Sequence, residues 1–559
     1  MSQRSKSDKI RAGSIVYCLL AIFLFLISEL TWLQLIRGDT FAKRARDQRI
    51  EVLCKTPLRG TIYDRNMQVL AGTFYEPAIV IFPELVSDRG SVEEFLSLTS
   101  GAAISQEASL SQLSAQARLY LDASKVSLGS SDSKIPDDPG VAVIRQPVRY
   151  DPTGLAAHVI GYLDNENITG ISGIEKTYDT YLRSGDIGLI ASFVDARRVP
   201  YKGLGIRWLH DAEAAADVVL TIDRQIQEIV EEVMDARISR GAVVVMDPET
   251  GRVLAMASRP SFSPNNVGSA FTQPLFPMIN RAITPYPAGS ILKIVVAACG
   301  LEKDVVALSD KFYDPGFIDV GSQRFKCYLH DSEGHGWISF LDAMAYSCNS
   351  VFIETALRIG GKSLVDFYEN LGFGATTGIS LPFEQPGQLP GAYYMSLQDT
   401  ANLAIGQGEV LVTPLQVAVL LSVIANGGEL VSPRLVSEIK PKGGGTITGL
   451  KSDMSRRVLS QDTCRQLTFM LESVTRWGTA KAGWVDEFGS CGKTGTAETG
   501  RLDSAGHPIC HAWFGGFTPL QNPHFVIVVF AEEGGSGGEV AAPVFQEIAG
   551  RLLFESSHN

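Results

Sequence analysis

A serine and a lysine stand three residues apart in the run Pro-Ala-Gly-Ser-Ile-Leu-Lys. Ser290 follows a proline and a glycine and precedes an apolar run, so we expect it at a helix N-terminus with Lys293 one turn further on the same face. A serine hydroxyl is a weak nucleophile until a base takes its proton, and a lysine amine at this spacing could take it. The helix N-terminus would offer backbone N–H groups to a developing oxyanion. Alone, Ser-x-x-Lys is too common to establish a site.

Two further short motifs follow in the chain. In Ser-Cys-Asn, the hydroxyl of Ser347 could relay a proton and the amide of Asn349 could bind a substrate carbonyl. In Lys-Thr-Gly-Thr, the lysine supplies a positive field, the glycine allows close backbone approach, and two hydroxyls could bind a carboxylate. A helix end and an exposed hairpin edge are the structural alternatives for the two motifs. The Lys-Thr-Gly-Thr motif comprises Lys493, Thr494, Gly495 and Thr496.

Metal-ligating residue types surround the Ser-Cys-Asn motif. Two sulfurs, one nitrogen and one carboxylate would satisfy a closed tetrahedral zinc site. A disulfide between the two cysteines and two unrelated free thiols are the competing interpretations. His330 is a further potential ligand. The four residues of the predicted site are Asp314, Cys327, His335 and Cys348.

Composition excludes several classes of protein. With 559 residues, of which 45% are hydrophobic and 20% charged, the chain should form two or three folded units rather than a disordered or disulfide-stapled protein. The 49 basic and 61 acidic side chains give a net charge of -12, and no basic stripe is present, so we expect no nucleic-acid partner. The eight cysteines show no CxxC spacing and leave the redox compartment undecided.

An almost continuous apolar run over residues 14–36 predicts one transmembrane helix, because it would reach about 34 Å at 1.5 Å per residue. Basic residues in the preceding tail, residues 1–13, favour a cytoplasmic N-terminus, although a comparable basic cluster follows the run. No small-residue cleavage site ends the run, which favours an uncleaved anchor. Glu29 lies inside the predicted span, where its carboxyl group would either contact a partner helix or reach water at the interface.

The rest of the chain divides at residue 216. Residues 37–216 combine short β-like runs with a weakly patterned, Ser- and Ala-rich stretch at 97–138, which predicts an extended pedestal with a mobile insertion. Residues 217–559 predict a compact α+β domain, because strand-like runs lie at both ends of this segment and helical patterns fill its middle. The sheet should therefore be assembled from both ends of the segment.

The order and spacing of the motifs resemble the penicillin-binding proteins, specifically the class B, monofunctional D,D-transpeptidases anchored by one N-terminal helix. The resemblance extends over nearly the whole chain and implies a transpeptidase domain with an antiparallel sheet flanked by helices. Further runs that resemble family boxes are RGTIYDRN at 59–66, HVIGY at 158–162, GIE at 173–175, NRA at 280–282, AIGQG at 404–408 and HAWF at 511–514.

The resemblance implies a role for each motif residue. Ser290 would attack the carbonyl between the two terminal D-alanines of a peptidoglycan stem peptide, with Lys293 as the base, and D-alanine would leave. A neighbouring stem amine would resolve the acyl-enzyme, and β-lactams would acylate the same serine. Backbone N–H groups of Ser290 and Thr496 would form the oxyanion hole. Ser347 would relay the proton to the leaving amine, Asn349 would hold the acyl side, and Lys493, Thr494 and Thr496 would bind the terminal carboxylate.

The resemblance also implies the setting of the reaction. The chemistry would require no cofactor, although elongation-type members make a structural zinc more plausible. The expected partners are a membrane glycan polymerase of the SEDS type and other cell-wall assembly proteins, with the anchor in the bacterial cytoplasmic membrane and the catalytic domain outside it. The alternatives are a membrane-anchored serine β-lactamase or β-lactam sensor, which lacks such a pedestal, and a non-enzymatic scaffold, which should have lost motif residues. A role in elongation or in division stays open.

Overall fold

The computed structural model forms two compact units. It describes residues 2–81, 86–99, 119–122, 135–136, 138, 140–164, 168–194, 206–209, 216–329, 331–441, 444–448 and 455–556. One unit comprises Met1–Pro57, Tyr75–Gln146 and Asp186–Ala212, and the other comprises Leu58–Phe74, Pro147–Gly185 and Glu213–Asn559. The predicted boundaries at residues 36 and 216 stay predictions, and the pedestal predicted between them contributes segments to both units.

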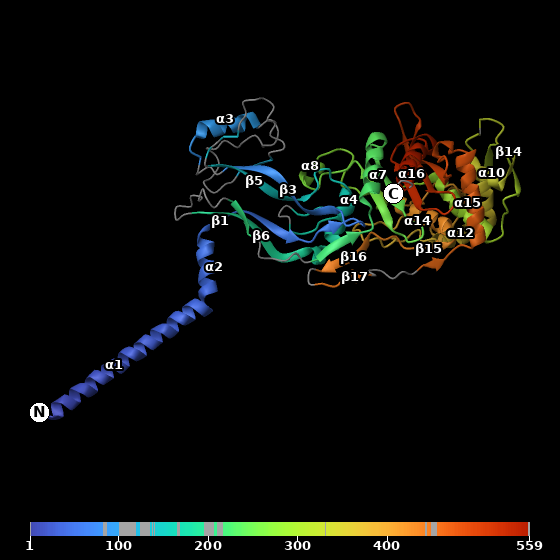
Figure 1. Cartoon of the computed structure of the whole chain (residues 1–559). Helices are drawn as coiled ribbons and strands as arrows, with labels where there is room; N and C mark the ends of the chain where they lie inside the picture. Colours follow the sequence, from blue (N-terminus) through green and yellow to red (C-terminus); the bar gives the residue numbers. More distant parts are fainter. Residues whose placement is uncertain are drawn as a thin grey trace. The chain divides into compact units, whose positions relative to one another are not determined.

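A long N-terminal helix begins the first unit and appears in blue in Figure 1. Helix α1 (Ser2–Thr31) continues into a short π-helical turn, η1 (Trp32–Ile36), and α2 (Gly38–Gln48) follows. From within α1 to the end of η1, Gly13–Ile36 forms a run of 24 residues with a mean hydropathy of 2.2. In the described part of the chain this is the one helix long and apolar enough to cross a membrane, in agreement with the span predicted at 14–36.

The rest of the first unit contains strands and one further helix, and several of these strands continue into segments of the second unit. One sheet has the order β1 (Ile50–Arg59), β6 (Arg183–Phe193), β7 (Ile206–Leu209). Strand β3 (Val69–Ile81) pairs with β4 (Leu119–Asp122) and with β5 (Val141–Tyr150). Helix α3 (Arg89–Thr99) lies between β3 and β4 in the sequence. The mobile insertion predicted at 97–138 lies largely outside the described residues.

The second unit is built on a five-stranded antiparallel sheet, as predicted. Its order is β10-β9-β21-β20-β19, so its strands come from both ends of the C-terminal segment. Strands β9 and β21 are buried throughout and therefore read as continuous apolar runs. The strands are β9 (Gly241–Met246), β10 (Val253–Arg259), β19 (Cys491–Leu502), β20 (Pro508–Thr518) and β21 (Phe525–Ala531).

Helices cover both faces of this sheet. Successive strand residues point to opposite faces, so the neighbours of Phe514 and Gly515 identify the two layers. The ring of Phe514 lies 4.7 Å from that of Phe545 in α16 (Ala542–Ser556), whereas Gly515 faces Leu421 in α14 (Pro414–Ala425). Helix α16 also packs on α7 (Arg224–Arg237), as Figure 1 shows in red and green. The sheet is thus enclosed between two helical layers.

The helical region between the two groups of strands contains the first two motifs. The apolar helix α9 (Lys293–Glu302) follows a 3₁₀ turn, η3 (Gly289–Leu292). Helices α10 (Phe340–Ala345) and α11 (Asn349–Ile359) flank the Ser-Cys-Asn motif, and α15 (Gln461–Arg476) packs on α9 and β19. A small antiparallel pair, β11 (Lys311–Asp314) with β14 (Gly336–Ser339), precedes α10.

Two family boxes from the predicted pedestal meet in the second unit. Buried Arg59 donates from Nε to Glu175 Oε2 at 2.6 Å, and Arg149 donates to the other carboxylate oxygen at 2.8 Å. Nearby, β2 (Ile62–Tyr63) pairs in parallel with β8 (Ala216–Leu220). Because a buried carboxylate needs charged partners, this ion-pair network links segments far apart in the sequence.

Candidate active site

The serine of the first motif lies on a tight turn rather than in the first turn of an α-helix. Ser290 is in η3, and the α-helical part begins only at Lys293. Gly289 has φ +56°, and a Cβ there would lie 2.5 Å from the carbonyl oxygen of Thr496 in β19. Only glycine fits this conformation and this close approach. The turn therefore brings Ser290 against the Lys-Thr-Gly-Thr strand, and it directly precedes the α-helix at whose N-terminus Ser290 was expected.

Neighbouring backbone and side chains fix this turn from two sides. The Gly289 N–H donates to the carbonyl oxygen of Gly406 at 3.1 Å. The indole Nε1 of Trp513, in β20, donates to the carbonyl oxygen of Pro287 at 2.9 Å. Gly406 and Trp513 belong to runs that resemble family boxes. Their contacts show that these runs position the turn of Ser290.

Lys293 is fully buried and directed at the Ser-Cys-Asn motif. Its Nζ donates to the Ser347 carbonyl oxygen at 2.6 Å, to Ser347 Oγ at 3.2 Å and to Asn349 Oδ1 at 2.7 Å. Burial lowers the pKa of Lys293 to about 8, although the acidic groups near it raise the pKa in part. At a pH slightly above neutrality, a substantial fraction of the Lys293 side chains is consequently uncharged.

A second buried lysine approaches the same hydroxyl from the sheet. Lys493 Nζ donates to Ser347 Oγ at 3.0 Å and to the Thr494 carbonyl oxygen at 3.1 Å. Burial, reinforced by the positive charge of Lys293, holds the pKa of Lys493 well below its usual range. The three motifs therefore converge on one hydroxyl group.

The Ser-Cys-Asn motif adopts a constrained conformation between α10 and α11. Ser347 has φ +56°, which is unusual for a residue other than glycine. Asn349 begins α11, and its Nδ2 donates to the Lys326 carbonyl oxygen at 2.8 Å while its Oδ1 accepts from Lys293. Both ends of the Asn349 amide are thereby fixed.

The Lys-Thr-Gly-Thr motif lies in β19, as predicted. Gly495 approaches the serine segment closely, since a Cβ would lie 2.4 Å from the Ala288 carbonyl oxygen. Thr496 is exposed and its Oγ1 accepts from the Gly537 N–H at 3.3 Å. Thr494 Oγ1 lies 3.2 Å from Thr479 Oγ1. The sequence analysis missed Thr479, because an isolated threonine outside the motifs carries no signal of its own.

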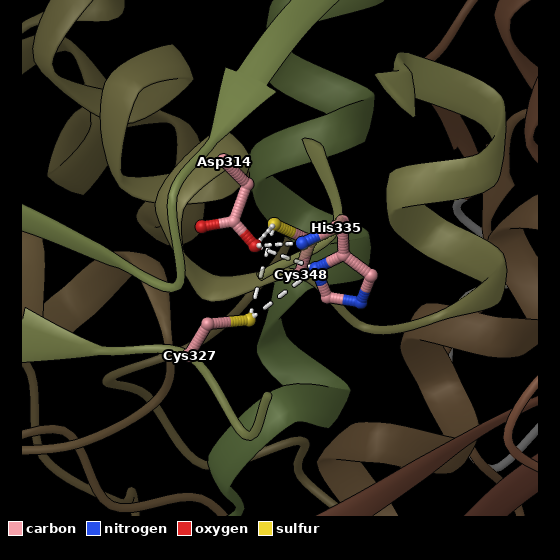
Figure 2. A group of neighbouring side chains, drawn as sticks. All are labelled: Asp314, Cys327, His335 and Cys348. Atoms are coloured by element: carbon pink, nitrogen blue, oxygen red, sulfur yellow. Dashed lines mark hydrogen bonds and ion pairs between the residues drawn. The ribbon is translucent and has the colours of Figure 1, made fainter. Parts of the chain in front are cut away.

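The four predicted metal-ligating residues also come together (Figure 2). One ligand atom from each lies within 4.8 Å of the others. Asp314 Oδ2 lies 2.6 Å from His335 Nδ1 and 3.3 Å from Cys348 Sγ, and Cys327 Sγ lies 3.7 Å from Nδ1 and 4.0 Å from Cys348 Sγ. Figure 2 shows these atoms directed at a common centre, with the other ring nitrogen of His335 pointing away.

Comparisons with known proteins identify the fold. Residues 241–550 match the family model "Penicillin binding protein transpeptidase domain", and residues 54–204 match "Penicillin-binding Protein dimerisation domain". The chain belongs to the penicillin-binding proteins. The combination of the two domains makes it a class B member.

Individual relatives of this penicillin-binding protein span most of its length. It is 30% identical to "Stage V sporulation protein D" of Bacillus subtilis over 94% of this chain and 83% of that protein. It is 28% identical to "Peptidoglycan D,D-transpeptidase MrdA" of Acinetobacter baumannii over 95% of this chain and 86% of that protein. A solved structure described as "Structural coordination of polymerization and crosslinking by a peptidoglycan synthase complex" matches with a TM-score of 0.68 and 26% identity over 97% of both chains.

The donor set of the four-residue cluster in this penicillin-binding protein fits a structural zinc ion. Two sulfurs, an imidazole nitrogen and a carboxylate oxygen are the ligand types of closed tetrahedral sites, and all four residues are largely or fully buried. Ser350 Oγ donates to Asp314 Oδ1 at 2.7 Å and so orients the carboxylate from outside the cluster. The sulfur atoms of Cys327 and Cys348 lie 4.0 Å apart, so no disulfide joins these two residues in this structure. His330, the further potential ligand, lies outside the described residues.

The protonation of the cluster also favours a cation. Burial raises the pKa of Asp314, but hydrogen bonds from Ser350 and His335 lower it to about 2. A hydrogen bond from Cys348 is the main cause that lowers the pKa of the Cys327 thiol. An anionic carboxylate and a thiolate enclosed together need a positive partner, which a bound zinc ion would supply better than a protonated His335.

The metal prediction is tested by elemental analysis of the purified protein. We expect about one zinc per chain, with loss of the metal in Cys327→Ser because a ligand is removed. Since the cluster holds the loop of Ser347 and Asn349, we expect thermal stability and the rate of penicillin acylation to fall together. Cys464→Ser, in another buried free cysteine, is the matched control and should keep its zinc. Substoichiometric zinc with a Cys327–Cys348 disulfide would contradict the site.

Proposed function

We propose that this chain is a peptidoglycan D,D-transpeptidase that acts through an acyl-enzyme on Ser290. The observation that carries the proposal is the meeting of two buried lysines, Lys293 and Lys493, at Ser347 Oγ beside the turn of Ser290. A nucleophile, an amine of lowered pKa and a hydroxyl relay are the groups that acyl transfer by a serine requires.

In the acylation step, Ser290 Oγ attacks the carbonyl carbon between the two terminal D-alanines and gives its proton to the neutral amine of Lys293. The proton then passes through Ser347 Oγ to the nitrogen of the leaving D-alanine, as the carbon–nitrogen bond breaks. Hydrogen bonds of both lysines to Ser347 Oγ support this relay. The product is an ester of Ser290 with the stem peptide.

Strand β19 would bind the substrate and its developing charge. The backbone N–H groups of Ser290 and Thr496 would hold the oxyanion, and the close approach of Gly289 to Thr496 supports this pairing. The terminal carboxylate would be bound by Lys493 and by the hydroxyls of Thr494 and Thr496. Asn349, fixed at both ends of its amide, would hold the acyl side of the substrate.

The ester is resolved when the amine of a neighbouring stem peptide attacks its carbonyl, which forms the cross-link and frees Ser290. β-Lactams acylate Ser290 in place of the dipeptide, and slow hydrolysis of that ester separates a transpeptidase from a β-lactamase. None of these steps uses the zinc ion, whose role would be structural.

We also propose that the apolar run Gly13–Ile36 anchors the protein in the cytoplasmic membrane with its catalytic domain outside, beside a glycan polymerase of the SEDS type. The length and hydropathy of the run support the anchor. The similarity to a chain from a peptidoglycan synthase complex supports a polymerizing partner.

The nucleophile is tested with Ser290→Ala. We expect complete loss of covalent labelling by a fluorescent penicillin with an unchanged melting temperature, because only the attacking hydroxyl is removed. Ser422→Ala, in the buried helix α14, is a control that should label normally. Labelling of the Ser290 variant would contradict the assignment, and rapid release of penicilloate by the unmodified protein would instead identify a β-lactamase.

The base is tested by the pH dependence of acylation. Only the neutral amine of Lys293 can accept a proton, so the acylation rate should rise with pH through about 8 and level off above it. Lys293→Ala should lower the rate about 10²- to 10⁴-fold and remove this ionisation from the profile. A rate that is independent of pH between 6 and 9 in the unmodified protein would exclude the base role.

The partner is tested at Glu29. A carboxyl group inside the apolar run is costly unless it contacts a partner or reaches water, so Glu29→Leu should weaken copurification with the polymerase. Penicillin labelling should not change, because the site lies in the other unit. Ser14→Leu, at the start of the same run, provides a control substitution. Unaltered copurification would favour the interpretation in which the carboxylate reaches water.

A further inference from the structure

A cavity of about 240 Å³ lies in the second unit, outside the motif residues. It is lined by His158, by residues 172–173, by Phe262, and by residues within 278–284 and 381–385. Its walls are mostly apolar, with a small number of polar groups, as is typical of sites for small organic groups. The apolar wall residues are Phe262, Met278, Ile279, Ile283, Leu381 and Phe383.

His158 supplies an acceptor without a partner in this cavity. Its side chain is 8% exposed, and Nε2 lies 2.7 Å from the Pro277 carbonyl oxygen. Because a carbonyl oxygen only accepts, Nε2 carries the proton and Nδ1 has the free lone pair. Burial lowers the pKa of His158 to about 4, so the ring is neutral at physiological pH. In the described part of the chain, no side chain or backbone group is hydrogen-bonded to Nδ1.

Nδ1 is not among the fully enclosed side-chain atoms that lack a partner, so it keeps some accessible surface. His158 and Phe262 pack edge to face at 5.1 Å, and both line the cavity. A ligand in the cavity would therefore meet an aromatic wall and a hydrogen-bond acceptor together. A purely apolar group would leave the acceptor unpaired, which costs binding energy.

The backbone around the cavity is held in costly conformations. Leu275, Phe276 and Phe383 have φ values of +70°, +52° and +66°, which apolar residues with a Cβ adopt rarely. Buried Arg281 fixes the first two, because its Nη2 donates to the Leu275 carbonyl oxygen at 2.8 Å. Lys176 Nζ lies 4.4 Å from the centre of the Phe383 ring, and Phe383 is 70% exposed at the cavity. The walls are therefore shaped in advance of any ligand.

We propose that this cavity binds an aromatic group carrying a hydrogen-bond donor, such as a phenol or an indole, through His158 Nδ1. The donor would lie at Nδ1 and the ring between Phe262 and the aliphatic wall. The wall residue Ile283 belongs to the 3₁₀ turn Arg281–Ile283, and the chain continues from it to the turn of Ser290. Two sources offer this chemistry: a free small molecule, or a tyrosine or tryptophan side chain of a partner protein.

The test compares two nearly isosteric probes, para-cresol and 4-fluorotoluene, by ligand-detected NMR titration of the full chain in detergent. Only para-cresol has a donor, so we expect it to bind about 3- to 10-fold more tightly, as one net hydrogen bond allows. Equal affinities would overturn the role of Nδ1. In His158→Phe, the ring is kept but has no hydrogen-bond acceptor, so the two affinities should become equal.

A second variant keeps the test decisive if His158→Phe does not fold. Met278→Trp should fill the cavity and abolish the binding of both probes. Any NMR signal change that remains then measures partition of the probes into detergent. Normal penicillin labelling of this variant would establish that it is folded. Undiminished saturable binding in Met278→Trp would overturn the proposal.

N-acetyltyrosinamide distinguishes the two sources of the aromatic group, because it carries the same phenol on a peptide backbone. Binding of both para-cresol and this amide, each lost in Met278→Trp, would support a partner side chain. Binding of para-cresol alone would support a free small molecule, because the cavity would then exclude a peptide backbone. Binding of neither would overturn the proposal.

Discussion

Two lysine side chains without exposed surface donate hydrogen bonds to one hydroxyl, the Oγ of Ser347. Each loses its hydration, and two positive charges so close together repel strongly where water is absent. In the described part of the chain, no carboxylate forms an ion pair with either Nζ. The pKa of each lysine is consequently lowered by its own burial, and of Lys493 also by Lys293. The same burial that destabilises the charges produces the neutral amine that acyl transfer needs.

Close backbone approach places the turn of Ser290, the proposed nucleophile, against the strand that carries Lys493. Gly289, Gly406 and Gly495 each lie where a Cβ would be 2.0–2.5 Å from a backbone oxygen of another segment. The serine turn is therefore enclosed by backbone on two sides, and the indole of Trp513 holds it from a third. This packing explains why the helix of Lys293 begins with a 3₁₀ turn, since Gly289 at φ +56° leads the chain into it.

Local patterns allowed much of this to be predicted. Helix α7 at Arg224–Arg237 is an example, because its apolar spacing and the capping side chain of Asp223 lie within one segment. The order of the strands and the pairing of Arg59 with Glu175 depend on contacts across more than a hundred residues, which one sequence does not encode in any local pattern. Thr479 could not be predicted for a different reason: an isolated threonine outside the motifs carries no signal, although it contacts Thr494 only 15 residues away. The residues of the metal cluster were predicted correctly as neighbours, whereas their state depends on bound metal and oxidation.

The cluster of Asp314, Cys327, His335 and Cys348 would act on the site through geometry rather than through chemistry. Cys348 stands between Ser347 and Asn349, so a restraint on its sulfur also restrains the two functional side chains. A φ of +56° is an energetically unfavourable backbone conformation for Ser347. A residue in such a conformation persists only when its surroundings hold it there. Cys348 Sγ, held against Asp314 and Cys327, is one such determinant, and Lys293 and Lys493 are others. Loss of the cluster would therefore relax Ser347 away from both lysines and lower acylation without removing any reacting group.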